Sequence, residues 1–281
     1  MRLLAPGKLI LTGAYAVLHG APAIVVAVDR YAIADTDAPD DVDVRALHDE
    51  GGRKLGLGSS SASIVASLAA RALALGEDPR DSVVRATLFR AAREAHARSQ
   101  AGGSGADVAA AVHGGVLSYV GGSEDASVRG VDLPTLLVWR VFWSGTSART
   151  SDLLARVQAL RTQTTSALDE LGRLATRAAD AVDAGDAALF VGTAREYGAA
   201  LAVLGRAADA PIVPPAFAEL ALVADSEGGA FLPSGAGGGD VGVWLSSAPP
   251  STAFIARAKA LSMRPLALDV DRGGVRPQSA A

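Results

Sequence analysis

The chain of 281 residues contains no cysteine. Disulfides, thiolate zinc sites and a cysteine nucleophile are therefore excluded. The four histidines are scattered and show no metal-ligand spacing. The net charge is -4, and no run rich in lysine or arginine is present. Nucleic-acid binding proteins use a basic surface, so we expect no nucleic-acid partner.

Long apolar runs are also missing from the sequence. No segment reaches about 18 uninterrupted apolar residues, so we expect no membrane span. Residues 1–15 lack the charged region, apolar run and cleavage site that are typical of a secretory signal. A cytoplasmic location is the resulting expectation. The sequence leaves a monomer and a homodimer both open.

What the chain does have is apolar content, much of it alanine. Hydrophobic residues make up 49% of the sequence and charged residues 20%, which predicts a substantial core. The many alanines indicate helices that pack closely through small side chains. The length suits one large domain or two modest ones that share an interface.

Apolar periodicity predicts a mixture of helices and strands. The strands do not alternate regularly with helices, so a doubly wound parallel sheet is not favoured. The acidic stretch 35–50 is expected to be an exposed hairpin or loop, and 121–134 a loop. Strands are expected at 9–12, 23–29, 115–120, 136–143, 241–245 and 265–270. Helices are expected at 59–75, 82–99, 106–111, 215–226 and 252–261, with two or three more in 150–204.

One glycine-serine segment stands directly before a predicted helix. Glycines let backbone amides approach a ligand, and the first turn of a helix offers unpaired N–H groups and a positive dipole end, so together they can bind phosphate. A serine hydroxyl there can also coordinate Mg²⁺. An ordinary serine N-cap gives the same pattern, so both interpretations stay open. It is not a Walker loop, because GxxxxGK[ST] is absent. The segment is Gly56, Leu57, Gly58, Ser59, Ser60 and Ser61.

Three further features could carry chemistry. Residues 233–240 read PSGAGGGD, and so many glycines make sense where the backbone wraps a ligand, although a flexible hairpin loop would look the same. Asp107 begins a short predicted helix, where an acid is also favoured simply by the helix dipole. Lys8 is a lone lysine near the start of a strand, a position that usually has no function.

Taken in order, these segments resemble the signature regions of the GHMP kinases. The residues APGK at 5–8 with GAYAVLHG are similar to the first motif, GLGSSS to the second and PSGAGGGD to the third. SGADVAAAVHGG resembles the segment with the family's active-site aspartate. Within the family, WSGTSA at 143–148 and the closing RPLALDVDRGGVR resemble the bacterial phosphomevalonate kinases more than the mevalonate kinases.

The resemblance implies an α+β fold with two domains. Residues 1–145 would form an ATP-binding domain related to ribosomal protein S5 domain 2. Residues 146–281 would form a ferredoxin-like domain. ATP and the substrate would lie in the cleft between them.

The resemblance also implies roles for individual residues. Lys8 would stabilise charge at the reacting phosphates, and Asp107 would orient the acceptor and the lysine. Residues 56–61 would wrap the ATP phosphates, Ser60 would reach Mg²⁺, and Glu94 would be a second magnesium ligand. The residues implied to face the substrate are Ser104, Gly105, Ser147, Arg149, Ser234, Gly235, Ala236, Gly237 and Gly238.

The function implied is ATP-dependent phosphorylation of phosphomevalonate, a small anionic metabolite, in the mevalonate route of isoprenoid biosynthesis. A mevalonate kinase or another GHMP small-molecule kinase is the alternative. A non-catalytic nucleotide- or metabolite-binding relative is a second alternative, because two polar positions of the family pattern are apolar here. Ala14 stands where the first motif commonly has an acid, and Leu232 where the third often has a lysine.

Overall fold

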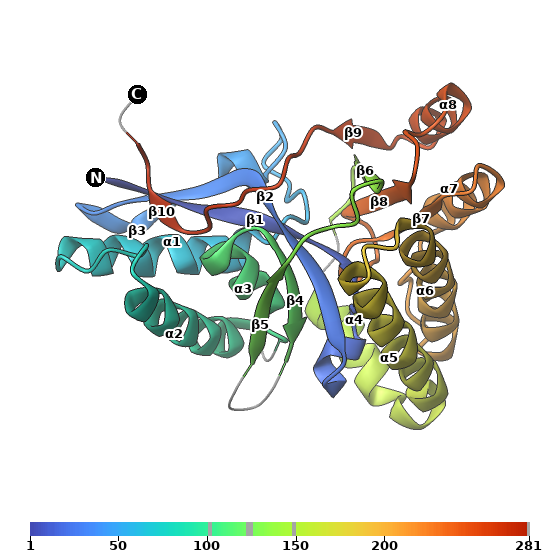
Figure 1. Ribbon diagram of the computed structural model, residues 1–281, viewed down its shortest axis with the longest axis horizontal. Helices are drawn as coiled ribbons and strands as arrows, with labels where there is room; N and C mark the ends of the chain where they lie inside the picture. The colour runs from blue at the N-terminus through green and yellow to red at the C-terminus, as the bar shows by residue number, and fades with distance from the viewer. Residues whose placement is uncertain (101–102, 122–125, 148–149, 280–281) are drawn as a thin grey trace.

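Two long strands form the middle of the molecule in the computed structural model, which describes residues 1–100, 103–121, 126–147 and 150–279 (Figure 1). β1 (Arg2–Thr12) and β2 (Pro22–Asp35) pair antiparallel along almost their whole length. Residues 23–28 are buried without interruption. Helices from both the earlier and the later part of the chain contact β2, which explains why its apolar run is continuous rather than alternating.

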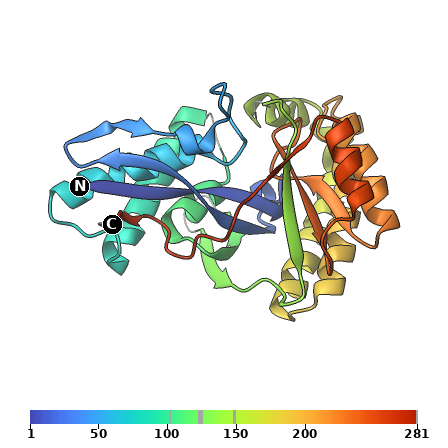
Figure 2. The ribbon, with the colours of Figure 1, turned by 90° about the horizontal axis from the view of Figure 1, so that it is seen from above.

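The first sheet is built outward from this pair, and all its strand pairs are antiparallel. Its order is β10-β1-β2-β4-β5, and β3 pairs with β2 beyond this path. The C-terminal strand thus returns to the first strand of the chain, and the two termini lie on the same side of the molecule (Figure 2). The added strands are β3 (Ala38–Asp43), β4 (Val116–Val120), β5 (Ser127–Val131) and β10 (Arg276–Pro277).

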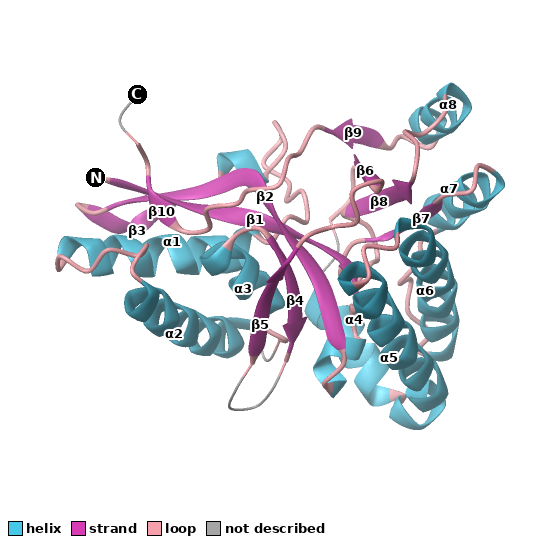
Figure 3. Ribbon diagram, viewed as in Figure 1, coloured by secondary structure: helices cyan, strands magenta, loops and turns pink. Residues whose placement is uncertain are grey.

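Helices from the first part of the chain cover one face of this first sheet (Figure 3). α1 (Ser59–Ala74) and α3 (Ala106–His113) contact β1 and β2 directly, and α2 (Ser82–Gln100) packs against both helices. The buried faces of α1 and α3 consist largely of alanine. Small side chains allow a close approach to the sheet, as the composition predicts. Two short 3-10 helices, η1 (Ala16–His19) and η2 (Arg45–Leu47), lie in the connections.

The second sheet has four antiparallel strands in the order β7-β8-β6-β9. Strand, helices, strand, strand, helix and strand follow one another, which is the ferredoxin-like connectivity. Phe142, Phe231 and Phe254 form the centre of an aromatic cluster on this sheet. Its elements are β6 (Val138–Trp143), α4 (Thr150–Ala159), α5 (Arg161–Asp183), α6 (Ala187–Ala207), α7 (Pro215–Ser226), β7 (Ala230–Pro233), β8 (Val241–Ser246), α8 (Thr252–Ala260) and β9 (Arg264–Leu266).

One helix among the described residues, α6, is long and apolar enough to cross a membrane. Length and composition alone are weak evidence for a span. α6 packs against α5, α7, β7 and β8, and Phe190, Tyr197 and Leu201 on it are buried in the core. Its apolar character is therefore accounted for by contacts within the fold.

The mixed α+β fold with a ferredoxin-like second part agrees with the sequence-based expectation, whereas several details differ. The expected loop 121–134 contains β5, and β7 was not expected at all. The division between residues 145 and 146 stays a prediction, but strand pairing favours a boundary before β6, which belongs to the second sheet. β10 then crosses back to β1.

Candidate active site

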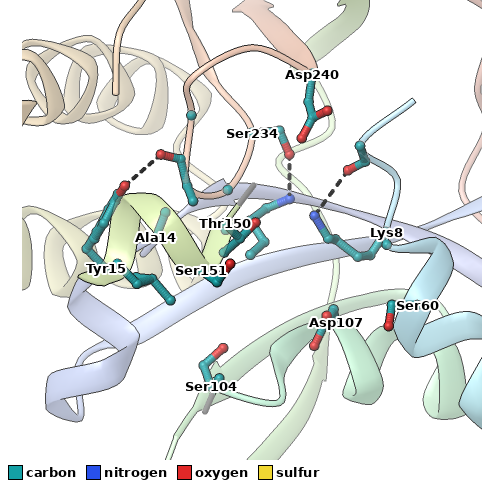
Figure 4. Close-up of a pocket in the computed structure, with 18 of the residues that line it drawn as sticks. Lys8, Ala14, Tyr15, Ser60, Ser104, Asp107, Thr150, Ser151, Ser234 and Asp240 are labelled. Atoms are coloured by element: carbon teal, nitrogen blue, oxygen red, sulfur yellow. Dashed lines mark hydrogen bonds between the residues drawn. The ribbon is translucent and has the colours of Figure 1, made fainter. Parts of the chain in front are cut away.

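A cavity of about 500 Å³ lies between the two parts of the molecule (Figure 4). Strand β1, the start of α1 and the start of α3 form one side, and the loop after β7 and the start of α4 form the other. Its size falls within the range of small-molecule sites. The lining residues singled out from the sequence are Lys8, Gly56, Gly58, Ser59, Ser60, Ser104, Asp107, Ser147, Ser234, Gly235, Ala236 and Gly237.

Lys8 lines this cavity from β1. Its Nζ donates to the Gly56 carbonyl at 3.3 Å, and its backbone N–H donates to the Leu57 carbonyl at 2.8 Å. Burial lowers the pKa of the Lys8 ammonium, while the Asp107 and Asp240 carboxylates act in the opposite direction. Figure 4 shows Lys8 between these two acids, one from each side of the cavity.

The first glycine-rich segment takes the backbone path that a phosphate site requires. Gly56 and Gly58 have φ values of 80° and 77°, which favour glycine. Gly58 is the N-cap of α1, so the first turn of that helix opens toward the cavity through Ser59 and Ser60. A Cβ atom added to Gly58 would lie 3.0 Å from Lys8 Cγ, so the glycine also makes room for the lysine.

The second glycine-rich segment closes the cavity from the opposite side. Ser234 Oγ accepts from the Ile10 N–H at 2.9 Å, and the Tyr15 hydroxyl donates to the Ala236 carbonyl at 2.7 Å. A Cβ atom on Gly235 would lie 3.6 Å from Lys8 Nζ. The loop is therefore fastened to β1 at Ile10 and to Tyr15 just beyond the end of β1, and it lines the same cavity as the start of α1.

Asp107 points into the cavity from the first turn of α3. Its Oδ1 accepts from the Val108 N–H at 3.0 Å, and its Oδ2 lies 3.4 Å from His96 Nε2. His96 comes from α2 and is 7% exposed. Asp107 is thus held by its own helix and by a buried imidazole, which fixes the direction of the carboxylate toward Lys8.

The remaining wall is rich in hydroxyl groups. Ser147, Thr150 and Ser151 line the cavity around the start of α4, and Ser104 faces it from the loop before α3. The Tyr119 hydroxyl donates to the Ser104 carbonyl and so fastens that loop. These hydroxyls can donate to the oxygens of an anionic ligand.

Several cavity residues were missed in the sequence reasoning. Asp240 closes the PSGAGGGD segment, and Lys54 stands just before GLGSSS, so both lay beside recognised motifs. Tyr15 belongs to the first motif and has a φ of 64°, which is uncommon for a non-glycine residue. His96 had no local signal, because the packing of α2 on α3 brings it to Asp107.

Other residues named from the sequence lie elsewhere. Leu57 is buried in the core, Ser61 Oγ donates back to the Gly58 carbonyl, and the Gly238 N–H donates to the Ile212 carbonyl. Gly105 packs beside Arg93 and Tyr119. None of these four is among the residues that line the cavity.

One implied ligand residue lies away from the cavity, and another is not described. Glu94 has a side chain that is 72% exposed, lies 3.8 Å from Arg98 and is not among the lining residues. The position of Glu94 on the outer side of α2 therefore does not support a magnesium ligand there. Arg149 lies outside the described residues.

The two departures from the family pattern have structural counterparts. Ala14 lines the cavity, and its carbonyl accepts from the buried Tyr197 hydroxyl at 2.6 Å. Leu232 is 2% exposed within β7, where it packs in the main core. A charged side chain at Leu232 would be costly to bury, so this position suits an apolar residue.

Comparisons with known proteins agree with this arrangement. Residues 25–115 match the family of GHMP kinases N-terminal domains. The phosphomevalonate kinase of Streptomyces sp. (strain CL190) is 29% identical over 88% of this chain and 90% of that protein.

Two solved structures share the fold over nearly the whole chain. The Lin0012 protein from Listeria innocua has a TM-score of 0.84 at 22% identity and covers 98% of both chains. Streptococcus pneumoniae phosphomevalonate kinase, solved in complex with phosphomevalonate and AMPPNP, has a TM-score of 0.79 at 19% identity and covers 96% of this chain and 99% of that one. The fold is therefore that of the GHMP kinases. Within that fold, residues 25–115 are similar to the N-terminal domain of the GHMP kinases, and most of the chain is similar to a phosphomevalonate kinase, a phosphotransferase.

Proposed function

We propose that this protein transfers the terminal phosphoryl group of ATP to phosphomevalonate, forming diphosphomevalonate and ADP. One observation supports the proposal: residues 56, 58–60 and 234–237 line the same cavity as Lys8 and Asp107. The similarity to the two phosphomevalonate kinases supports the choice of acceptor.

On the donor side, the start of α1 and the backbone of the two glycine-rich segments would hold the ATP phosphates. Free N–H groups and the positive end of a helix dipole favour a bound anion. Lys8 would neutralise charge that spreads over the transferred group. Phosphoryl transfer depends mainly on such positioning and charge stabilisation, and it needs little covalent help from the protein.

On the acceptor side, the hydroxyls of Ser104, Ser147 and Thr150 would hold the substrate, with Lys54 at the edge of the cavity. A phosphate monoester has a second pKa of about 6, so it is largely dianionic near neutral pH and needs no base. Asp107 would then orient Lys8 and the substrate. Its fixed position beside His96 fits this orienting role.

A magnesium ion would accompany the nucleotide. The described residues contain no cluster of three or more histidine and acidic side chains that could form a metal site by themselves. Mg²⁺ commonly binds through one or two protein oxygens together with substrate phosphates, and the donors on this cavity fit that pattern. Ser60, Asp107 and Asp240 would supply them. The bound ion would offset charge on the phosphates.

Mevalonate is the second candidate acceptor, because the pairing of Asp107 with His96 would also suit a general base. An alcohol acceptor benefits from such a base, whereas a phosphate does not. A non-catalytic nucleotide-binding role is the third possibility, and the apolar Ala14 in the cavity wall motivates it.

An assay that couples ADP release to a spectroscopic signal separates these functions. The purified protein is offered Mg-ATP with phosphomevalonate, mevalonate, homoserine or galactose in turn. Turnover with phosphomevalonate at least tenfold above every other acceptor is the expected result. Preference for mevalonate would overturn the acceptor assignment, and nucleotide binding without any turnover would overturn the kinase assignment.

A further inference from the structure

Arg53 lies just outside the cavity and links two of the three segments that form its rim. It precedes Lys54 and Gly56, which line the cavity, but is not itself a lining residue. Its guanidinium is held by the Asp49 carboxylate, with Nη2 to Oδ2 at 2.7 Å and Nε to Oδ2 at 3.0 Å. Asp49 Oδ1 also accepts from the Arg53 backbone N–H at 2.7 Å. The side chain therefore leaves a tight turn in a fixed direction.

From this turn, Arg53 reaches across to the second part of the molecule. Its Nη1 donates to the Gly145 carbonyl at 3.0 Å, and its guanidinium lies 5.0 Å from the centre of the Trp143 ring. Gly145 belongs to the segment that joins β6 to α4 and leads directly to Ser147 on the cavity wall. One arginine thus links the approach to the first glycine-rich segment with the approach to the hydroxyl-rich wall.

The ring of contacts is closed by Asp240. The Ser144 N–H donates to the Asp240 carbonyl at 2.8 Å, and the Asp240 N–H donates to the Thr146 carbonyl at 3.0 Å. A Cβ atom added to Gly56 would lie 2.3 Å from Asp240 Cβ, so these two residues are in close contact. Residues 53–56, 144–146 and 240 therefore form a closed ring, in which the Arg53 side chain makes the link between the first two segments.

We propose that Arg53 is a positioning residue that sets the distance between the donor wall and the acceptor wall of the cavity. This inference rests on the proposed kinase function. Phosphoryl transfer requires the donor and the acceptor to be in line, and a misplacement of about 1 Å can cost about a hundredfold in rate. Loss of the Gly145 link should therefore lower the turnover rate more than the affinity for ATP, because Arg53 does not line the cavity.

Arg264 provides a matched control. Its guanidinium also lies against the Trp143 ring, at 4.7 Å from the centre, and its Nη2 is 3.9 Å from the same Asp49 carboxylate. The side-chain bond to Gly145 comes from Arg53. Comparing Arg53→Ala with Arg264→Ala therefore separates the link across the ring from a general stabilising effect of a cation on this tryptophan.

The experiment measures kcat, the KM for ATP and the melting temperature for Arg53→Ala, Arg53→Lys and Arg264→Ala. We expect both Arg53 variants to lower kcat about tenfold or more. Alanine removes the side-chain hydrogen bonds, and lysine lacks the planar guanidinium that bonds to Asp49 and Gly145 at the same time. Both should keep the KM for ATP within about threefold of the wild-type value, and Arg264→Ala should keep kcat within about threefold. An unchanged kcat in Arg53→Ala, or equal losses in Arg53→Ala and Arg264→Ala, would overturn the proposal.

Hydrogen exchange tests the same link without any turnover. The amides of Ser144 and Asp240 should exchange at least about threefold faster in Arg53→Lys than in the wild type, and not in Arg264→Ala, since the ring would open locally. Unchanged exchange at both amides would overturn the positioning role. If the variants show this exchange pattern but the wild type phosphorylates no acceptor, the result counts against the proposed function and not against the structural link.

Discussion

Replacement of Lys8 by methionine tests the centre of the site. Methionine keeps the length and apolar character of the lysine stem and removes its charge. In the structure the ammonium lies 3.3 Å from the Gly56 carbonyl, close to Gly235 and between Asp107 and Asp240. The substitution therefore removes the cation at the point where both glycine-rich segments face the cavity.

The expected loss follows from the surroundings of the charge. A preorganised positive charge in a site that excludes water stabilises a transition state with delocalised negative charge by about 3 kcal/mol. This corresponds to roughly a hundredfold in kcat/KM. Removal of the ammonium also removes the cost of desolvating it, but it leaves two carboxylates without a nearby cation. We expect these two effects on the free energy of unfolding to offset each other in part.

Steady-state ADP release measures this loss, and thermal unfolding shows whether the variant is folded. Lys8→Arg keeps the charge but needs more room beside Gly58, so its activity should fall between that of Lys8→Met and the wild type. Lys259→Met on the exposed surface of α8 is the matched control and should behave as the wild type. Activity of Lys8→Met within threefold of the wild type would remove Lys8 from the mechanism.

Three further predictions concern Asp107, the second glycine-rich loop and the half-buried His113. Asp107→Asn should lower turnover at least about tenfold, since the carboxylate beside Lys8 is lost, and a change within threefold in the ADP-release assay would contradict its orienting role. Gly237 has a φ of 78°, and an added Cβ would lie 2.0 Å from the Ile212 carbonyl, whereas Gly228 has a φ of 73° in open space. Urea unfolding should therefore show a loss of more than about 2 kcal/mol for Gly237→Ala and about 1 kcal/mol for Gly228→Ala, and equal losses would refute the steric argument. Burial, with a smaller effect of Arg85, lowers the pKa of His113 from 6.5 to about 4. Between pH 6.5 and about 4, His113 is protonated in the unfolded chain but not in the folded one. The free energy of unfolding should therefore fall as the pH drops through this range, by about 2 kcal/mol after allowance for partial exposure. His113→Gln should flatten this part of the stability curve, and an unchanged slope would show that other groups cause it.

The helices and the central strands could be predicted because their signals are local. α1 and α2 follow from apolar periodicity. Parts of β1 and β2 follow from the apolar runs at 9–12 and 23–29, and residues 23–28 are buried without interruption. The segment of β5 was predicted to be a loop. Its five residues are exposed or half-exposed and include a glycine, and the strand lies at the edge of the sheet. β7 has four residues, all buried, which is too few for periodicity to distinguish a strand from a helix.

The cavity could be predicted where the chain carries a motif and not where packing creates the neighbour. Residues 56–60 and 234–237 stand out because glycine is needed for their backbone paths. His96 reaches Asp107 only through the packing of two helices, whereas the family resemblance implied a ligand role for Glu94, which is exposed. The role of Arg53 depends on a contact with Gly145 far along the chain, for which no local pattern exists.

The position of Lys8 explains why the site needs both parts of the molecule. Burial alone would drive this lysine toward its neutral form, which could not stabilise a phosphoryl group. The two carboxylates that oppose this effect come from α3 on the first sheet and from the end of the loop after β7 on the second. Asp240, which lies against Gly56, therefore offsets part of the effect that burial has on the pKa of Lys8. The second part of the chain thus contributes to the electrostatic environment of the lysine. Contacts at the rim of the cavity, including that of Arg53, would therefore affect the proposed chemistry without touching the substrate.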